Sequence, residues 1–313
     1  MRRFGEFQRQ NRTSSVTAAV PLVDLMIVGA QKAATSSVLR LLAQHPGLNC
    51  QEFYEMRYFT SDAEYEAGYD AAFATEFPKA RAGRPVVAKN AMILHVPLAA
   101  ERLRLHRPDV KVVVLLRDPV RRAYSAYWWA RVAGFETITE FEQALHADPA
   151  RFDSPMARAN CDYLENGCYD ISLSRVFELF TRDQVRVYFD DDLRERPAVV
   201  CSDLLTWLGL PPEHDIDTAR RVNLAAEARS AQFAHLLRNP PKSVRRAVNL
   251  VLPRSAVRRV YRRLAELNRR DFTPPPMRVA TELELLEYFR PHDLRLAWLV
   301  DRPLPWACWP DGT

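Results

Sequence analysis

The sequence predicts an α/β fold in which a central parallel sheet is covered on both faces by helices. Short runs rich in Val, Ile and Leu recur along the chain, and most of them lead into segments whose apolar residues repeat at helical spacing. Continuously apolar strands that alternate with helices are typical of a parallel sheet buried on both faces. No apolar run approaches the ~18 residues that a membrane span requires.

The first strand–helix unit begins at Leu22. It follows a polar, basic segment, residues 1–20, which we expect to be a disordered tail. The run LVDLMIVG ends at Gly29, the small-residue turn AQKAATSS follows, and the apolar residues of VLRLLAQHPG recur at helical spacing until Pro46 and Gly47 end them. These segments predict a strand, a tight turn and a helix.

Further units of the same kind follow along the chain. The run VKVVVLL, residues 110–116, predicts a strand, and Pro119 is well placed in the first turn of the helix after it. The run VRVYF, residues 185–189, predicts another strand, followed by a helix over PAVVCSDLLTWLGL. PVVAK, residues 85–89, is expected to be a short buried strand.

Residues 212–280 differ in composition, because they are rich in Arg and Pro. We expect one or two basic amphipathic helices here, forming an insertion or lid at about 225–275, before a final helix over ELELLEYFRPHDLRLAWL returns to the core. A solvated helix face, contact with an acidic acceptor and contact with a membrane surface are alternative roles for this basic segment. Residues 21–310 are predicted to form a single domain.

Composition limits the classes of function. The chain has 313 residues, 48% of them hydrophobic, so it can bury a sizeable core, and its formal net charge of +5 favours an anionic partner. Five cysteines without a C-x-x-C pair indicate reduced thiols rather than a disulfide framework or a zinc site. The first residues lack the pattern of a secretory signal, so we expect a cytoplasmic protein.

The turn after the first strand has the composition of a phosphate-binding loop. Its small, basic and hydroxyl residues are Lys32, Ala33, Ala34, Thr35, Ser36 and Ser37. Amides at the start of a helix can face an anion, hydroxyls can donate to its oxygens, and the lysine can neutralise its charge. An ordinary turn with a Ser or Thr N-cap has the same composition, so the loop alone leaves both interpretations open.

The spacing of the loop differs from two well-known nucleotide motifs. A Walker A loop has its lysine directly before the hydroxyl residue, whereas Lys32 lies three residues ahead of Thr35, which argues against a nucleoside-triphosphate hydrolase. There is also no G-x-G-x-x-G for a dinucleotide.

A second candidate anion site follows the strand over residues 110–116. Arg117 stands at the strand end and can offer two donors to a phosphate, while Ser125 lies two turns into the next helix and can add a hydroxyl. An arginine in this position also commonly forms a surface salt bridge. Because carboxyl ends of parallel strands meet at one edge of a sheet, the two anion sites are expected to lie close together.

Taken together, three segments resemble the sulfotransferases that use 3′-phosphoadenosine-5′-phosphosulfate (PAPS), in particular soluble bacterial members related to heparan-sulfate-type enzymes. They are IVGAQKAATSSVLRLLAQHP, VVVLLRDPVRRAYSAY and GCYDISLSRVFELFTRDQVRVYFDDDLRERPAVVCSDLLTWLGLPP. The resemblance runs from about Leu22 to Trp306. It implies a three-layer sandwich like that of P-loop NTPases and sulfuryl transfer, without a metal, to a hydroxyl or, less favoured, an amine of a carbohydrate, glycolipid or small metabolite.

The resemblance also implies roles for individual residues in holding PAPS. The loop from Lys32 to Ser37 would bind the 5′-phosphosulfate, and Lys32 would stabilise the leaving oxygen. Arg117 and Ser125 would hold the 3′-phosphate, with Arg229 as a possible further ligand. Ala33 and Ala34 stand where the family often has glycine; their methyl groups narrow the approach of the backbone to the anion but do not forbid it if φ stays negative.

The stretch YEMRYF resembles the family segment that carries a catalytic glutamate, here Glu55, with Tyr54 in place of the usual lysine. VVAKNAM resembles the E-K-[ST]-P stretch but retains only Lys89 from it. Glu55 would accept the proton of the acceptor if burial or an apolar neighbour raises its pKa, and Lys89 would neutralise charge. His95 is a competing base, and we favour Glu55 over it.

Two other functions stay open from the residues alone. One is a nucleotide-dependent kinase with a divergent phosphate loop. The other is a basic nucleic-acid-binding protein built on the Arg-rich segment. The preferred interpretation expects a small-molecule or glycan acceptor and no nucleic-acid partner.

Overall fold

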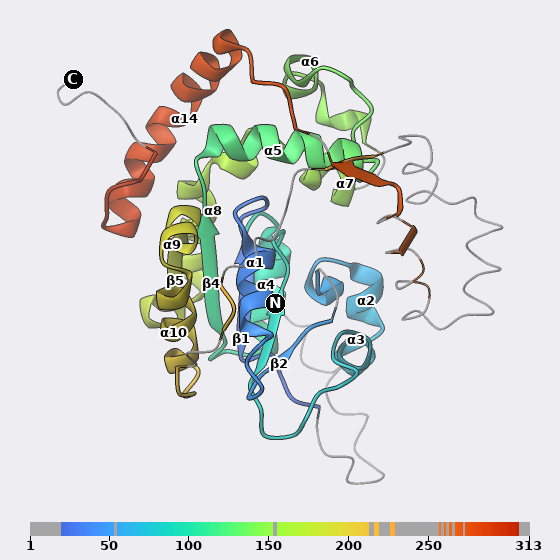
Figure 1. Cartoon of the computed structure of the whole chain (residues 1–313), viewed down its shortest axis with the longest axis vertical. Coiled ribbons are helices and arrows are strands. Elements are labelled where there is room, and N and C mark those ends of the chain that lie inside the picture. The colour runs from blue at the N-terminus through green and yellow to red at the C-terminus, as the bar shows by residue number, and fades with distance from the viewer. Residues whose placement is uncertain are drawn as a thin grey trace, which may run out of the picture.

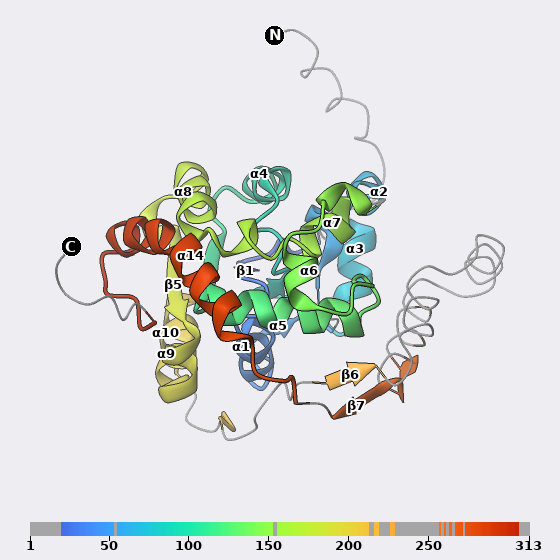
Figure 2. The same cartoon turned by 90° about the horizontal axis from the view of Figure 1, so that it is seen from above.

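A computed structural model defines the architecture of the chain (Figures 1 and 2). The structure describes residues 20–52, 55–152, 155–212, 216–218, 226–228, 257, 260, 263–264, 267–271 and 273–306. Among the helices of this described part, none combines the length and apolar character that crossing a bilayer requires.

The centre of the molecule is a five-stranded sheet in the order β2-β3-β1-β4-β5, with every neighbouring pair parallel. Its strands are β1 (Leu25–Gly29), β2 (Asn49–Cys50), β3 (Val86–Lys89), β4 (Lys111–Leu116) and β5 (Val185–Phe189). All residues of β1 and β3 are buried, as the continuous apolar runs require. The central position of β1 places the turn after it in the middle of the carboxyl edge.

Helices cover both faces of this sheet. The helices α1 (Thr35–Leu42) and α10 (Pro197–Trp207) lie on one face, and α4 (Pro97–His106) and α8 (Tyr169–Leu179) lie on the other (Figure 2). The helix α5 (Pro119–Val132) runs across the carboxyl ends of the strands (Figure 1). The predicted three-layer arrangement is thus confirmed.

Shorter elements complete the described part of the fold. They are α2 (Asp62–Glu66), α3 (Tyr69–Glu76), α6 (Phe141–Leu145), α7 (Pro155–Asn160), α9 (Asp190–Glu195) and the 3₁₀ turns η1 (Arg57–Phe59), η2 (Pro149–Arg151), η3 (Glu165–Gly167) and η4 (Arg182–Gln184). Most of them lie in the connections between strands.

The predicted strands and their following helices agree with the structure, and one strand of the central sheet was missed. The strand β2 has only two residues, so its sequence shows no alternation of apolar and polar residues from which a strand could be predicted. It pairs with β3, where Cys50 lies opposite Val87. Backbone pairing, rather than the character of its own side chains, makes it a strand.

The C-terminal part contains the predicted final helix, α14 (Val279–Val300), which buries Leu285, Phe289 and Leu296. At the two ends of the predicted lid the structure has strands, β6 (Ala226–Ala228) and β7 (Arg269–Asp271), which pair antiparallel. Helix was expected at both places, and pairing across the two ends satisfies backbone groups that a helix would have satisfied internally. Most of the predicted lid and residues 1–19 of the tail lie outside the described residues.

Candidate functional site

Five strands end at the carboxyl edge of the sheet, and the segment at each end carries side chains that can bind a ligand or take part in a reaction. Across the edge these are the Glu55 segment after β2, Lys89 at the end of β3, the loop after β1, Arg117 after β4 and Asp190 after β5. Ligands of open parallel sheets bind at this edge, because the loops there converge around a common crevice. Residues separated by as much as 158 positions are thereby gathered on one side of the fold.

The loop after β1 has a backbone shaped for an anion. The amide of Ala30 donates to the carbonyl of Leu115 on β4 at 2.6 Å, which ties the loop to the neighbouring strand. Lys32 has φ of 69° and Ala34 has φ of 62°, and the residue between them keeps the ordinary sign. Backbone conformations that alternate between left- and right-handed turn successive amides toward one concavity, as in anion-binding nests. The condition that φ stays negative is therefore met at Ala33 but not at Ala34.

The start of α1 distinguishes between the two interpretations of this loop. The N-cap is Ala34, which has no side chain able to cap, so Thr35, Ser36 and Ser37 lie within the first turn itself. The first amides of a helix carry partial positive charge, although here that of Ser37 donates to the carbonyl of Ala34 at 2.8 Å. The ordinary explanation of these hydroxyl residues as an N-cap does not apply, and the amides of the first turn suit an anion.

Arg117 lies next to this loop. Its Nη1 donates to the backbone carbonyl of Lys32 at 3.3 Å, and its Nε lies 3.4 Å from a carboxylate oxygen of Asp190. The guanidinium is thus held between the loop after β1 and the end of β5. The two segments that the sequence singled out as anion sites are in direct contact.

Asp118 fixes the start of the helix that follows Arg117. Its carboxylate accepts from the amide of Val120 at 2.9 Å and from that of Arg121 at 3.4 Å, as an N-cap does. Burial raises the pKa of Asp118 above its ordinary value, although these two amides oppose the shift. Ser125 lies in the second turn of α5 and is partly exposed.

Glu55 and Lys89 form an ion pair beside the loop. Lys89 donates from Nζ to Oε1 of Glu55, while Oε2 accepts from the amide of Ala91 at 2.9 Å. The side chain of Lys89 is only 1% exposed, whereas that of Glu55 is 38% exposed. The surroundings of Glu55 are therefore polar and charged rather than the apolar ones we considered. The carboxylate has a fixed orientation and one side open to solvent.

Two polar residues that the sequence did not single out hold this pair in place. The side-chain oxygen of Gln51 accepts from the amide of Lys89 at 2.5 Å. Asn90 donates from Nδ2 to the carbonyl of Met56 and to Oγ1 of Thr60, both at 2.9 Å. Asn90 appeared in the sequence only as a departure from the family pattern, yet it fastens the segment of Glu55 to the end of β3.

Asp190 was also missed, although a signal was present. It directly follows the strand VRVYF, just as Arg117 directly follows β4, and strands β4 and β5 are neighbours. Burial raises the pKa of Asp190, and the charge of Arg117 opposes this shift. Opposite charges at adjacent strand ends could have predicted the contact.

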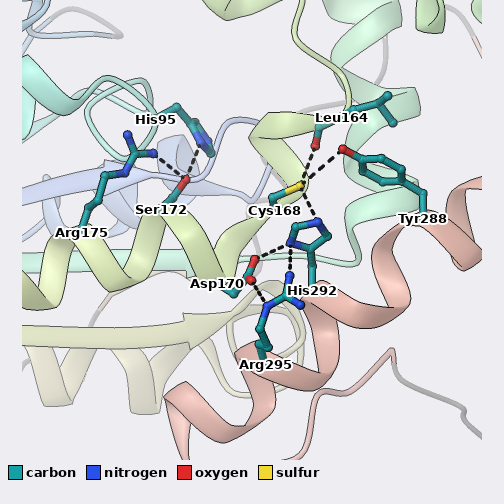
Figure 3. A network of polar contacts seen from close by, with 9 residues as sticks. All are labelled: His95, Leu164, Cys168, Asp170, Ser172, Arg175, Tyr288, His292 and Arg295. Atoms are coloured by element: carbon teal, nitrogen blue, oxygen red, sulfur yellow. Dashed lines mark hydrogen bonds and ion pairs between the residues drawn. The ribbon is translucent and has the colours of Figure 1, made fainter.

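His95 faces α8 rather than the Glu55 carboxylate. Its Nδ1 lies 3.4 Å from Oγ of Ser172, which in turn accepts from Arg175 (Figure 3). Burial, with the positive charges of Arg122 and Arg175, lowers the pKa of His95 to about 3. An imidazole with so low a pKa is a weak base near neutral pH. This environment favours Glu55 over His95 as a proton acceptor.

Arg229, a predicted cofactor-binding residue, cannot be placed, because it lies outside the described residues, as does Tyr54. Within the described ranges, no group of three His, Cys, Asp or Glu side chains could hold a metal ion. The chemistry available at the edge is thus a basic loop, an arginine and an oriented carboxylate–lysine pair.

Comparison with known proteins gives related chains and a related fold. Bifunctional heparan sulfate N-deacetylase/N-sulfotransferase 1 of Caenorhabditis briggsae is 28% identical over 207 residues, which are 61% of this chain and 23% of that protein. Bifunctional heparan sulfate N-deacetylase/N-sulfotransferase 4 of Mus musculus is 24% identical in an alignment of 311 positions that covers 91% of this chain and 31% of that protein. The chain thus spans less than a third of the length of these relatives.

A crystal structure of a sulfotransferase from Alicyclobacillus acidocaldarius has the same fold, with a TM-score of 0.64 and 22% identity over 91% of this chain and 98% of that one. Residues 22–244 match the sulfotransferase domain family. This match covers both the loop after β1 and the segment of Arg117. The chain belongs to the sulfotransferase domain family.

Proposed function

We propose that the protein transfers a sulfuryl group from PAPS to a hydroxyl, or alternatively an amine, of a carbohydrate, glycolipid or small-metabolite acceptor. The observation that carries this proposal is the contact between Arg117 and the backbone of Lys32. It joins two basic segments from neighbouring strands, as one nucleotide with two anionic ends requires. Membership of the sulfotransferase family supports the reaction class.

The residues of the edge fit such a nucleotide. The amides and hydroxyls from Lys32 to Ser37 suit a phosphosulfate, since the loop concentrates donors and positive charge. Arg117 and Ser125 suit the 3′-phosphate, with Arg229 as a further ligand. Bound PAPS would supply the activated sulfuryl group, and adenosine 3′,5′-bisphosphate would be the leaving group.

We assign charge stabilisation to Lys32 and Lys89, and removal of the acceptor's proton to the carboxylate of Glu55. Lys32 would neutralise charge that develops on the leaving oxygen, as in related transfers of charged groups. Glu55 would accept the proton of the acceptor, because its orientation is fixed by Lys89 and Ala91 while one side stays open. General-base assistance of this kind contributes ~10²–10⁴-fold to a rate.

The class of acceptor has a second candidate. The relatives named above are N-sulfotransferases of heparan sulfate, which favours an amine on a glycan as the alternative to a hydroxyl. Paired assays with N-deacetylated heparosan and with its N-acetylated form would separate the two. Transfer of label from radioactive PAPS to the first glycan alone would favour the amine.

Binding of adenosine 3′,5′-bisphosphate tests the proposal itself. Titration calorimetry should give saturable binding that does not need magnesium and is weakened by Arg117→Ala. Magnesium-dependent turnover of ATP would instead favour the kinase, and steeply salt-dependent binding of DNA would favour the nucleic-acid-binding protein. Absence of binding to the bisphosphate would reject the proposal.

Several finer expectations stay predictions. They are a cytoplasmic location, a single domain over residues 21–310, and a lid or peripheral membrane contact formed by the basic segment at 225–275. Incubation of cell extracts with radiolabelled PAPS and the protein, followed by identification of the labelled product, would name the natural acceptor.

A further inference from the structure

Helix α14 has a row of exposed apolar side chains that neither the fold nor the proposed reaction uses. Its members are Val279, Leu283, Leu286, Leu294 and Trp298. The exposed fraction is 61% at Leu283 and reaches 84% at Trp298. Single exposed apolar residues are common on protein surfaces, but several of them on one face of one helix mark an interaction site. We call these five residues the α14 stripe.

The α14 stripe lies on one face of the helix. Its members are spaced by three, four or eight residues, which the helical repeat of 3.6 places on one side, and Arg290 lies midway along the eight-residue step from Leu286 to Leu294. Leu285, Phe289 and Leu296 lie on the other side of the helix and are buried in the protein. Within the described part of the chain, the side of α14 that carries Leu285, Phe289 and Leu296 is covered, and the α14 stripe is exposed.

A polar cluster holds α14 in this orientation (Figure 3). Asp170 at the start of α8 interacts with His292 Nδ1 at 2.7 Å and accepts from Nε of Arg295 at 2.6 Å. The thiol of Cys168 lies 3.4 Å from Nε2 of the same histidine. Rotation of the helix to bury the α14 stripe would break these contacts and expose a buried carboxylate. The stripe therefore stays on the outside.

The order of residues along α14 is self-complementary. In an antiparallel pair of these helices centred between Tyr288 and Phe289, Val279 lies level with Trp298 of the second copy. Leu283 likewise lies level with Leu294 of the second copy. Val279 thus lies opposite the larger Trp298, and Leu283 lies opposite a second leucine. The two members of each pair are equally far from the centre. A two-fold axis needs this property, because every residue contact must occur twice.

The charges follow the same symmetry. Glu287 and Arg290 are exposed and lie on either side of the same centre, so each stands level with its opposite charge on the second copy. In a parallel pair in register, Glu287 would instead face Glu287 of the second copy, and Arg290 would face Arg290. Opposite charges beside an apolar seam select partner and orientation in paired helices.

We propose that the α14 stripe is the interface of a homodimer in which two copies of α14 pack antiparallel about a two-fold axis. From Val279 to Trp298 the seam is about 28 Å long at ~1.5 Å per residue. It ends in Trp298, a residue type enriched among energetically dominant interface positions. Within each copy, α14 packs against α5 and α8 (Figure 2).

Sedimentation velocity of the full chain tests this proposal. The wild-type protein should sediment at ~10 µM with twice the mass of the 36.0 kDa chain. Leu283→Glu and Leu294→Glu should each raise the dimer dissociation constant at least 100-fold, because each places two buried charges in the seam. The matched control is Leu105→Glu on α4, which is 77% exposed and lies away from the stripe. It should leave the mass unchanged.

A charge exchange tests the antiparallel register. Glu287→Arg and Arg290→Glu should each weaken the dimer about tenfold, and the double variant should restore it. Circular dichroism checks that every variant stays folded. A wild-type chain that is monomeric at 100 µM overturns the proposal and assigns the stripe to a different protein or a lipid surface. Variants with an unchanged dimer mass, or a double variant that is weaker than both single ones, overturn it as well.

Discussion

Replacement of Glu55 by glutamine separates the structural role of this residue from its chemical one. The change removes the negative charge opposite Lys89, whose side chain is 1% exposed, but keeps a carbonyl oxygen that can accept from Nζ. Removal of one partner from a fully buried ion pair costs about 3–5 kcal/mol. Because Glu55 is itself 38% exposed, water can replace part of the lost interaction, and we expect about 1–3 kcal/mol.

The double variant Glu55→Gln/Lys89→Met provides the control. It removes the buried charge that the single variant leaves without its counter-charge, so it should recover most of the lost free energy of unfolding. Urea unfolding of both variants and of the wild type measures this difference. Sulfuryl transfer should not recover, because the proton acceptor is absent from both variants.

Activity gives the second half of this test. Glu55→Gln should lower turnover by ~10²–10⁴-fold while the affinity for adenosine 3′,5′-bisphosphate stays unchanged. Wild-type turnover in the single variant would refute the role of Glu55 as the base. A loss of stability below about 0.5 kcal/mol would refute the energetic argument from the buried lysine.

Three further predictions follow from the site and its surroundings. Lys32→Ala should abolish sulfuryl transfer but leave thermal unfolding unchanged, and retained activity would remove Lys32 from the chemistry. Arg117→Ala should weaken binding of adenosine 3′,5′-bisphosphate by ~10–100-fold in titration calorimetry, the equivalent of about 1.5–3 kcal/mol for charge-assisted hydrogen bonds; an unchanged affinity would contradict its role. Burial raises the pKa of Asp293, which accepts from Trp306 Nε1 at 3.1 Å, to about 7. The folded state therefore holds this proton more tightly than the unfolded state does, so stability falls as pH rises from about 4 to about 7. Asp293→Asn should be more stable than the wild type at pH 8, with the advantage vanishing below pH 4, in urea unfolding at both pH values; equal stability at pH 8 would refute the shift.

The layers of the fold could be predicted because their signals are local. β1, β3, β4 and β5 are short apolar runs next to turn residues, and a strand buried on both faces needs little more. The helices that follow were equally visible from their spacing. The two-residue β2 and the strands at the base of the basic segment were not, since their pairing partners are remote in sequence.

The candidate site divides in the same way. Lys32, the hydroxyl residues after it and Arg117 could be chosen from the sequence, since a small-residue turn after a strand and an arginine at a strand end are local patterns. That Arg117 donates to the carbonyl of Lys32 could only be expected in general terms from the common edge of the sheet. Its second partner, Asp190, was not expected.

By itself the sequence determined the α/β class, the loop after β1 that we propose as an anion site and the family to which the chain is similar, because each depends on contiguous residues. Tertiary structure decided that Glu55 pairs with a buried lysine, that His95 lies between arginines and loses its basicity, and that α14 keeps an apolar face outside. These properties depend on charge, burial and solvent at a point in space. Residues far apart in the chain create those conditions together, so no segment carries the information alone.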